Sequence, residues 1–334
     1  MGQWKIREID LQLKYPWKTA DYTVTNKKNF IISIRNGENI GEGEVALNHK
    51  FGETPDLIYT SFEKFTAART PPEVTSIEEL INFVDELELP SSLRFGIESA
   101  FVHYLASISE KKVSKLLGIK EINSIKTSYS LPILPIEEIT SFINDHNLHR
   151  FKALKLKITP ASGLETIREV RKNFSGNLRL DANESFSDSK QVLDFLEAAG
   201  DDCPIEFFEQ PLSRTSHDEY LSLCENSPVD IMADESITSQ DVSTYYSERF
   251  HAINVKLMKA GGYLRALKQL KNARELGMKV MLGCMVESSL GISSAMKIAH
   301  NFDYFDLDGF MFLKNDPFNL VSEENGRLFF SHLQ

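Results

Sequence analysis

The stretch ALKLKITPASGLETIREVRKNFSGNLRLDAN, residues 153–183, holds two apolar runs separated by a helical segment. Lysines alternate with leucines in the first run, so an extended strand would present Lys155 and Lys157 on one face and the leucines on the other. The second run ends in Asp181. If the leucine face packs against helices, both lysines point into the mouth of a barrel. The alternative is an edge strand at the surface with solvated lysines, the commoner environment of lysine.

The same strand-then-helix rhythm continues on both sides of this stretch, and it predicts a modified TIM (β/α)-barrel, an α/β fold. A doubly wound sheet is the structural alternative. No Gly-x-Gly-x-x-Gly follows the first predicted strand, however, and the polar strand ends come from many strands rather than from one switch point. The predicted strands are residues 130–134, 153–158, 177–181, 205–209, 230–234, 252–256, 279–283 and 305–308.

The chain before this repeat has a different pattern. Three alternating segments and an Asn36-Gly37 turn signal predict a small antiparallel sheet, and a helical pattern follows, clearest from Ser91 onward. We therefore predict an N-terminal α+β capping domain. The predicted divisions are 1–120 for the capping domain, 121–315 for the catalytic barrel, and 316–334 for a C-terminal segment that returns toward the cap.

Composition narrows the class of partner. The chain has 334 residues and a formal net charge of -11, which argues against binding of nucleic acid or of an anionic membrane surface. No apolar run approaches the roughly 18 to 20 residues of a membrane span. The three cysteines are widely spaced without a Cys-x-x-Cys pair, which is typical of reduced thiols. We expect a cytoplasmic protein that acts on a small molecule.

Three carboxylates close successive predicted strands: Asp181, Glu209 and Asp234. Each alone would more often be a helix N-cap. Carboxyl ends of neighbouring parallel strands meet at one rim, where three carboxylates would repel one another unless a cation neutralised them. Ligation by oxygen atoms alone favours Mg2+ over zinc. The pattern therefore predicts a magnesium site.

A second lysine on the far side of that rim would complete a proton-transfer site. Lys256 closes the 252–256 strand, and Lys259 follows in the same loop; strand alternation favours Lys256. A metal that neutralises a substrate carboxylate makes the adjacent carbon acid strong enough for a lysine, here Lys157 tuned by Lys155. Two alternatives remain open: a Schiff-base aldolase using Lys256, and a phosphate-binding loop at Gly261-Gly262.

Together these motifs resemble the enolase superfamily, in particular its muconate-lactonizing subgroup and the dipeptide epimerases within it. The resemblance covers nearly the whole chain, including the capping domain. It implies an enolase-like fold, one Mg2+ per subunit, a homo-oligomer, and a dipeptide substrate, with L-Ala-D/L-Glu from peptidoglycan recycling as the commonest case. The motifs are Lys155-Leu156-Lys157, Asp181-Ala182-Asn183, Glu209-Gln210-Pro211, Ala233-Asp234-Glu235-Ser236 and Lys256-Leu257-Met258-Lys259-Ala260-Gly261-Gly262.

The resemblance also implies the reaction: inversion of the α-carbon of the C-terminal residue through an enediolate, by 1,1-proton transfer between Lys157 and Lys256. Dipeptide epimerases bind the substrate α-ammonium with a pair of aspartates, here Asp306 and Asp308, whose two carboxylates favour a cation between them. Some relatives hold a glutamate side chain with an arginine near the position of Tyr22. That arginine is absent, so Lys18, Lys27 or Lys28 replaces it, or the substrate carries an apolar or small residue against Tyr22 and Phe51.

The remaining predicted site residues surround these groups. Ser130, Cys284 and Met285 follow predicted strands and are expected to line the substrate pocket, although core packing explains Met285 equally well. Asn183 and Glu235 are expected to orient ligands and lysines. The alternatives to epimerisation are an o-succinylbenzoate synthase or muconate cycloisomerase of the same subgroup, and a barrel that binds metal or peptide without catalysis.

Overall fold

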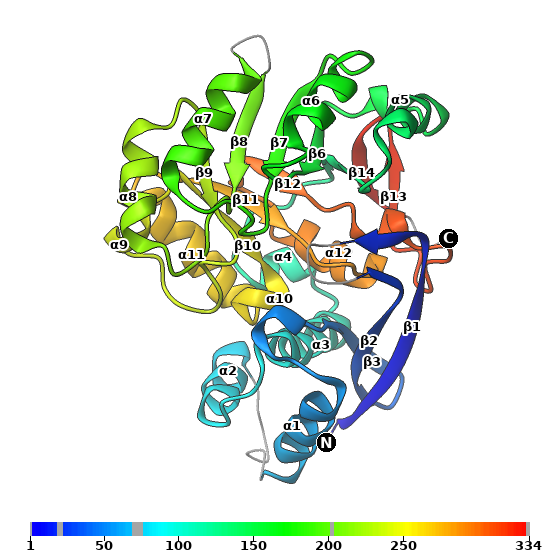
Figure 1. The fold of residues 1–334 in the computed structure, drawn as a ribbon. Coiled ribbons are helices and arrows are strands. Elements are labelled where there is room, and N and C mark those ends of the chain that lie inside the picture. Colours follow the sequence, from blue (N-terminus) through cyan, green and yellow to red (C-terminus); the bar gives the residue numbers. More distant parts are fainter. Residues whose placement is uncertain (1, 19–22, 69–75, 201–203, 332–334) are drawn as a thin grey trace.

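The computed structural model describes residues 2–18, 23–68, 76–200 and 204–331, in which a cap of sheet and helices packs on a barrel (Figure 1). The cap contains a three-stranded antiparallel sheet in the order β1-β2-β3. Helix α3 packs closely on this sheet, because a Cβ added at Gly43 would lie 2.2 Å from Gly96 O. The cap elements are β1 (Gln3–Lys18), β2 (Thr23–Asn36), β3 (Asn39–Ala46), η1 (His49–Phe51), α1 (Pro55–Ala67), α2 (Ile77–Glu86), α3 (Ser91–Ser109) and α4 (Val113–Leu116).

The predicted barrel is confirmed. Eight parallel strands form one sheet in the order β12 to β5, and Ser128 N donates to Phe305 O at 3.2 Å, which joins the first and last strands. Strand β5 ends at Leu131, earlier than predicted, because Pro132 follows and lacks an N–H for the ladder. The strands are β5 (Tyr129–Leu131), β6 (Ala153–Lys157), β7 (Asn177–Asp181), β8 (Ile205–Glu209), β9 (Asp230–Ala233), β10 (Ala252–Lys256), β11 (Lys279–Gly283) and β12 (Tyr304–Asp306).

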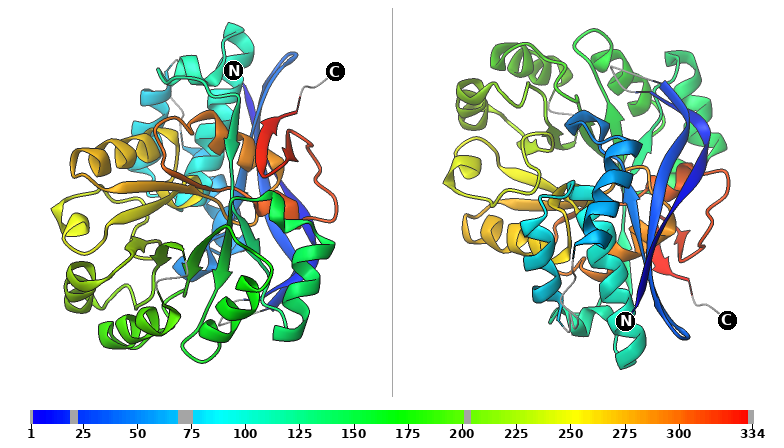
Figure 2. Two further views of the ribbon diagram at one scale, coloured as in Figure 1. Left: turned by 90° about the horizontal axis from the view of Figure 1, so that it is seen from above. Right: turned by 90° about the horizontal axis from the view of Figure 1, so that it is seen from below.

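Helices surround the barrel strands (Figure 2). They connect each strand to the next, as a parallel sheet requires. The helices are α5 (Ile136–Asp145), η2 (Leu148–Arg150), α6 (Gly163–Arg171), α7 (Ser189–Ala199), α8 (His217–Asn226), α9 (Thr244–Ser247), α10 (Leu257–Ala260), α11 (Tyr263–Glu275), α12 (Ser289–Lys297) and η3 (Gly309–Phe312).

The amino-terminal end of the barrel interior is closed by packing. Phe207 and Met281 belong to a fully buried apolar cluster there. The Arg179 guanidinium lies 5.5 Å from the ring centroid of Phe207 and 5.2 Å from that of Tyr304, and its Nε donates to Glu206 at 2.7 Å. The polar side chains of the opposite end therefore stand on a filled barrel rather than over a channel.

A third sheet was not predicted. Strands β13 (Val321–Glu324) and β14 (Arg327–Phe330) pair antiparallel with β4 (Ser124–Lys126). The chain before this hairpin runs beside β1, where Lys314 N donates to Gln12 O at 2.8 Å (Figures 1 and 2). We keep the divisions after residues 120 and 315 as a proposal.

Two buried carboxylates attach the cap to the barrel. Glu98 of α3 accepts from Leu264 N at 3.1 Å, in the first turn of α11. Glu44 of β3 accepts from Ser288 N and Gly291 N, each at 3.0 Å, at the start of α12. A helix N-terminus offers unpaired N–H groups and a partial positive charge, so each carboxylate is stabilised where it enters.

The Glu98 contact also decides the role of the glycine pair before α11. A Cβ added at Gly262 would lie 1.5 Å from Glu98 Oε2, and Gly262 has a φ of +145°. The N-terminus of α11, which follows the glycine pair, therefore binds the carboxylate of Glu98 in the position where a phosphate would have to bind. The phosphate-loop alternative is wrong.

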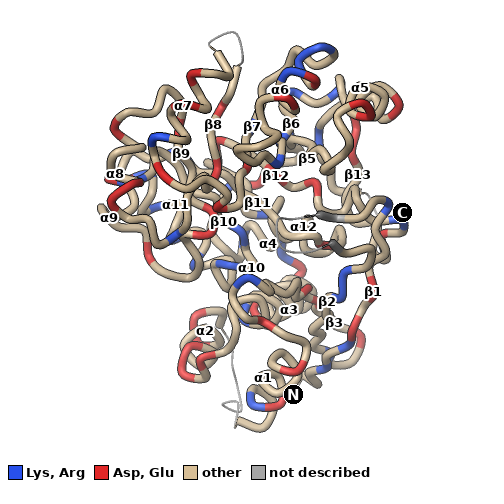
Figure 3. Tube along the Cα trace, in the orientation of Figure 1, with Lys and Arg blue, Asp and Glu red and all other residues tan. Residues whose placement is uncertain are grey.

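Charged residues of both signs occur throughout the described fold (Figure 3). Asp and Glu are interspersed with Lys and Arg over both the cap and the barrel (Figure 3). Within the described ranges, no helix has the length and apolar character needed to cross a membrane.

The Glu98 contact predicts a pH-dependent stability. Burial raises the pKa of Glu98 to about 7 from an ordinary value of 4.5, against the N–H groups of Leu264 and Tyr263 and the Arg94 charge. Because the folded pKa is the higher one, this carboxyl favours folding below about pH 4.5 and loses that contribution as the pH rises through about 7. Urea unfolding should show a steeper fall in the free energy of unfolding between these values for the wild type than for Glu98→Gln. Parallel pH profiles would contradict the assignment.

Candidate active site

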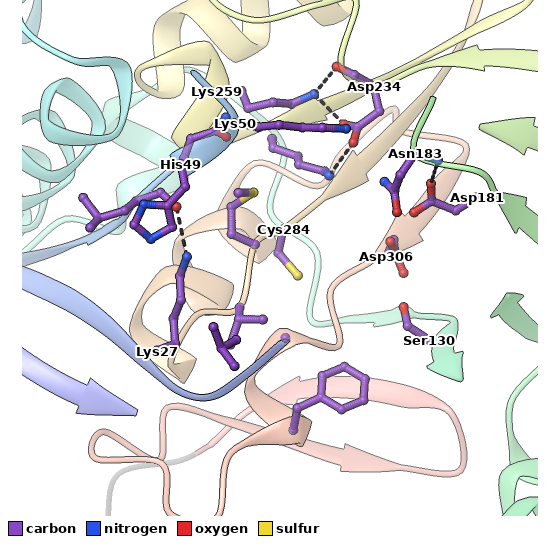
Figure 4. A pocket seen from close by; sticks show the side chains of 18 of the residues that line it. Lys27, His49, Lys50, Ser130, Asp181, Asn183, Asp234, Lys259, Cys284 and Asp306 are labelled. Atoms are coloured by element: carbon purple, nitrogen blue, oxygen red, sulfur yellow. Dashed lines mark hydrogen bonds and ion pairs between the residues drawn. The ribbon is translucent and has the colours of Figure 1, made fainter. Parts of the chain in front are cut away.

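A cavity of about 310 Å³ lies between the cap and the carboxyl ends of the barrel strands (Figure 4). Most residues predicted for the site line it. Glu209 lies beneath the cavity wall and is completely buried. Tyr22 lies outside the described residues, and so does the side chain of Lys18. The predicted residues that line the cavity are Ser130, Lys155, Lys157, Asp181, Asn183, Asp234, Glu235, Lys256, Cys284, Met285, Asp306 and Asp308.

Strand register brings the first group together. Lys157 on β6 is level with Asp181 on β7, which is level with Glu209 on β8. Lys157 Nζ lies 3.6 Å from Asp181 Oδ2. Asp234 follows β9 directly, and its backbone N–H is fixed by the Gln210 side chain at 2.9 Å. The three carboxylates predicted as metal ligands therefore come from adjacent strands at one end of the barrel.

Lys155 occupies the centre of this group. Its Nζ lies 2.8 Å from Glu209 Oε2, 2.9 Å from Asp306 Oδ2 and 3.3 Å from Asp181 Oδ2. Burial lowers the pKa of Lys155, but the carboxylates of Asp306, Glu209 and Asp181 outweigh that effect and raise it well above its ordinary value. Lys155 is therefore a fixed positive charge among the carboxylates.

The two candidate second bases both contact Asp234. Lys256 Nζ lies 2.9 Å from Asp234 Oδ2, and Lys259 Nζ lies 2.5 Å from both Asp234 O and Oδ1 (Figure 4). Burial raises the pKa of Asp234, but these two ammonium groups outweigh it and hold that pKa well below its ordinary value. Lys259 is tied to the main chain as well as to the carboxylate, whereas among the described residues the Nζ of Lys256 is hydrogen-bonded only to the carboxylate. Lys256 is therefore better placed to exchange a proton.

The donor set fits a hard divalent cation. Asp181, Glu209 and Asp234 offer carboxylate oxygens only, and the fully buried Glu209 Oε2 lies 2.8 Å from the Lys155 ammonium group. Burial, with Asp181 and Asp234 adding to it and Lys155 opposing it, raises the pKa of Glu209 to about 7. In the described chain no three His, Cys, Asp or Glu side chains lie together so that they could hold a metal ion, and Lys155 and Lys256 pair with Asp181 and Asp234. A cation would take over part of the neutralisation that the lysines provide.

The predicted substrate-binding aspartates lie on the β12 side. Asp306 Oδ1 accepts from Ser128 Oγ at 2.9 Å, and Asp308 Oδ2 accepts from Ser130 N at 2.5 Å. Burial, with the Asp306 charge adding to it, raises the pKa of Asp308 to about 7. Asp306 is already paired with Lys155. Asp308 is therefore the carboxylate whose charge a bound cation would stabilise most.

The cap supplies the facing wall of the cavity. Lys27, Lys28, His49, Lys50 and Phe51 line it. Lys27 Nζ donates to Leu47 O at 3.1 Å, and its burial lowers its pKa to about 8, although Glu53 and Glu287 oppose this. The cationic groups of the cap therefore face the carboxylates of the barrel.

Sequence reasoning gave no role to Gln210, which is completely buried. Its Oε1 accepts from Asp234 N and Ser236 N at 2.9 and 3.1 Å, and its Nε2 donates to Tyr220 OH at 2.8 Å. Gln210 has a φ of 38°, in the left-handed region that non-glycine residues rarely adopt. Its position after Glu209 was visible in the sequence, but its partners are not neighbours along the chain.

Asn254 also orients a predicted ligand. Its Nδ2 donates to Glu209 Oε1 at 2.9 Å. A Cβ added at Gly283 would lie 2.3 Å from Asn254 Oδ1, so the glycine makes room for this amide. The alternation of Asn254 with Lys256 on β10 is the sequence signal for this inward position.

The fold and site define a class: a capped β/α-barrel whose mouth combines strand-end carboxylates with lysines on opposite strands. The family model described as "Enolase C-terminal domain-like" matches residues 138–315. The chain belongs to this family.

Individual relatives are similar over nearly their whole length. The chain is 30% identical to an L-Ala-D/L-amino acid epimerase of Pedosphaera parvula, covering 96% of this chain and 94% of that one. A substrate-liganded L-Ala-D/L-Glu epimerase from Bacillus subtilis superposes with a TM-score of 0.90 at 26% identity, covering 98% and 96% of the two chains. A dipeptide epimerase from Enterococcus faecalis, complexed with Mg and L-Leu-L-Tyr, superposes with a TM-score of 0.88 at 24% identity, covering 98% and 96% of the two chains. At this identity the similarity shows a common fold only.

The Gln210 contacts predict a stability effect. Gln210→Leu removes the acceptor of two N–H groups, and each unsatisfied buried group costs about 1–3 kcal/mol. We expect a loss of that order or larger in the free energy of unfolding, measured by urea denaturation. Gln12→Leu changes an exposed side chain of the same type and serves as the control. Equal stabilities of the two variants would contradict the role of Gln210.

Proposed function

We propose that this chain is a Mg2+-dependent dipeptide epimerase that inverts the α-carbon of the C-terminal residue. The observation that carries the proposal is the placement of two lysines. Lys157 on β6 and Lys256 on β10 lie four strands apart in a ring of eight, which puts them on opposite sides of the mouth. A planar carbanion between them would be reached from one face by each lysine. Relatives named as epimerases, at 26 to 30% identity over almost the whole chain, support this reaction class.

Each lysine has a separate role in the proposed reaction. Lys157 removes or returns the α-proton on one face, and Lys256 does so on the other. Lys155, held among carboxylates, supplies fixed positive charge against the negative charge that develops when the proton leaves. Lys259 is assigned to holding Asp234, because its ammonium group is tied to both the main chain and the carboxylate.

We assign the metal to Asp181, Glu209 and Asp234. Oxygen-only ligands suit Mg2+, and the three carboxylates come from the ends of adjacent strands at one rim of the barrel. Mg2+ bound at these residues would supply positive charge to the substrate carboxylate. Asn254 would keep Glu209 oriented, and Gln210 would keep Asp234 in place.

The substrate is proposed to be Ala-Xaa, with Ala-Glu as its leading example. The α-ammonium would bind Asp308 and Asp306, and the C-terminal side chain would face the cap wall that contains Lys27 and Phe51. Cys284 and Met285 are assigned to the pocket wall. We also propose a cytoplasmic location, which rests on the widely spaced cysteines, and a homo-oligomer, which rests on the resemblance to the superfamily.

Proton NMR in D2O with Mg2+ tests the reaction directly. We expect the C-terminal α-proton signal of L-Ala-L-Glu, L-Ala-D-Glu or an apolar Ala-Xaa to disappear while the other epimer forms. Lys157→Ala should abolish exchange from one epimer and retain exchange from the other, because Lys256 still serves the opposite face. A Lys157→Ala variant that interconverts both epimers at the wild-type rate would refute the assignment of two bases.

Metal binding predicts a thermal shift that does not depend on turnover. A ligand that binds only the folded state raises the melting temperature. Millimolar Mg2+ should raise the melting temperature of the wild type, and EDTA should reverse this rise. In Glu209→Gln the rise caused by Mg2+ should be smaller. Glu206→Gln alters a carboxylate of the same strand that pairs with Arg179 and keeps the full shift. A wild-type melting temperature that is insensitive to Mg2+ would contradict the metal assignment.

A further inference from the structure

Lys50 belongs to the cap, yet its ammonium group reaches two carboxylates of the barrel. Its Nζ lies 2.8 Å from Glu235 Oε1 and 3.0 Å from Glu184 Oε2. The side chain of Glu235 is 5% exposed and that of Glu184 is 15% exposed. The Lys50 side chain is 31% exposed, so the shielded partner is Glu235. Removing Lys50 leaves the charge of that nearly buried carboxylate without this partner, which has more effect than the loss of an ion pair exposed on both sides.

The contact continues from Glu235 to the proposed base. Glu235 Oε1 also accepts from Asn183 Nδ2 at 3.2 Å, and Asn183 Oδ1 accepts from Lys157 Nζ at 2.6 Å. A carboxylate only accepts hydrogen bonds, so it selects the NH2 end of the amide and leaves the amide oxygen for Lys157. The orientation of Asn183 toward Lys157 therefore depends on Glu235 staying in place as an acceptor.

The second partner of Lys50 belongs to the same loop as Asn183. Asn183 and Glu184 have φ values of 45° and 71°, both in the left-handed region. Asparagine tolerates this conformation, but glutamate rarely adopts it, so other contacts must hold the loop. Glu184 N donates to Gln210 O at 2.8 Å, and the Glu184 carboxylate binds Lys50 and Arg214. Lys50 thus contacts Glu235, which binds the Asn183 side chain, and Glu184, which follows Asn183 in the chain.

We propose that Lys50 is a positioning residue for Lys157, which acts by supplying the counter-charge that keeps Glu235 on Asn183. The inference rests on the proposed epimerase function. It assigns the cap a role on one face of the reaction only, because the series Lys50–Glu235–Asn183 ends at Lys157. Lys256 is held by a different carboxylate, that of Asp234.

Initial rates of α-proton exchange in D2O, measured separately for each epimer by proton NMR, test this role. Lys157→Ala first identifies the epimer whose exchange depends on Lys157. Lys50→Met should then lower exchange from that epimer about tenfold more than exchange from the other, which is the effect of about one hydrogen bond. Lys50→Arg keeps the charge and should restore most of the difference.

Arg265→Met is the matched control. Arg265 of α11 pairs with Asp85 of the cap at 3.2 Å, so its loss loosens a contact between cap and barrel outside the series that ends at Lys157. The ratio of the two exchange rates should keep its wild-type value. An equal loss for both epimers in Lys50→Met, or none, would overturn the positioning role. Absence of exchange in the wild-type protein on every dipeptide would count against the epimerase function itself, and against the role of Lys50 with it.

Discussion

Buried negative charge is the constraint on which the rest of this structure depends. Asp181, Glu209, Asp234, Asp306 and Asp308 meet at one end of the barrel, where each is at most 5% exposed. Carboxylates at this density repel one another strongly in a low-dielectric interior, and they are compatible with folding only if cations are fixed among them. The lysines of β6 and β10 neutralise part of this negative charge. A metal bound by the carboxylates would do the same. The charges that make the site chemically active are thus the charges that allow it to fold.

Much of this arrangement could be predicted from the sequence, because a parallel barrel turns chain order into spatial order. Strand period fixes which side chains point inward, and register places successive strand ends at one level, as Lys157, Asp181 and Glu209 show. The strand from Asn177 to Asp181 was predicted to the residue. The strand predicted from residue 130 was extended too far past Pro132, since the apolar pattern continues after the ladder has stopped.

Contacts between the cap and the barrel could not be predicted in the same way. Glu44 and Ser288 are 244 positions apart, and Lys50 and Glu235 are 185 apart. No local period relates such pairs, because their contact depends on how two separately formed units dock. From the sequence, a glutamate in a strand or helix of the cap is indistinguishable from an ordinary surface residue. Its role becomes clear only when the barrel helix whose N-terminus it contacts is known. The hairpin of β13 and β14 escaped prediction for the same reason, since its partner β4 lies near residue 125.

The barrel has two ends with opposite conformational character. At the mouth, Asn183, Glu184 and Gln210 hold left-handed backbone conformations, and like charges are crowded together. At the other end, the Arg179 guanidinium lies beside the Phe207 and Tyr304 rings over a sealed apolar layer, and it donates to Ser128 Oγ at 3.1 Å, which in turn donates to Asp306. The two ends are therefore joined at this point: engineering for heat tolerance belongs in the apolar layer around Met232 and Met281, with Arg179 left in place. Relaxing the strained mouth would gain stability at the expense of turnover.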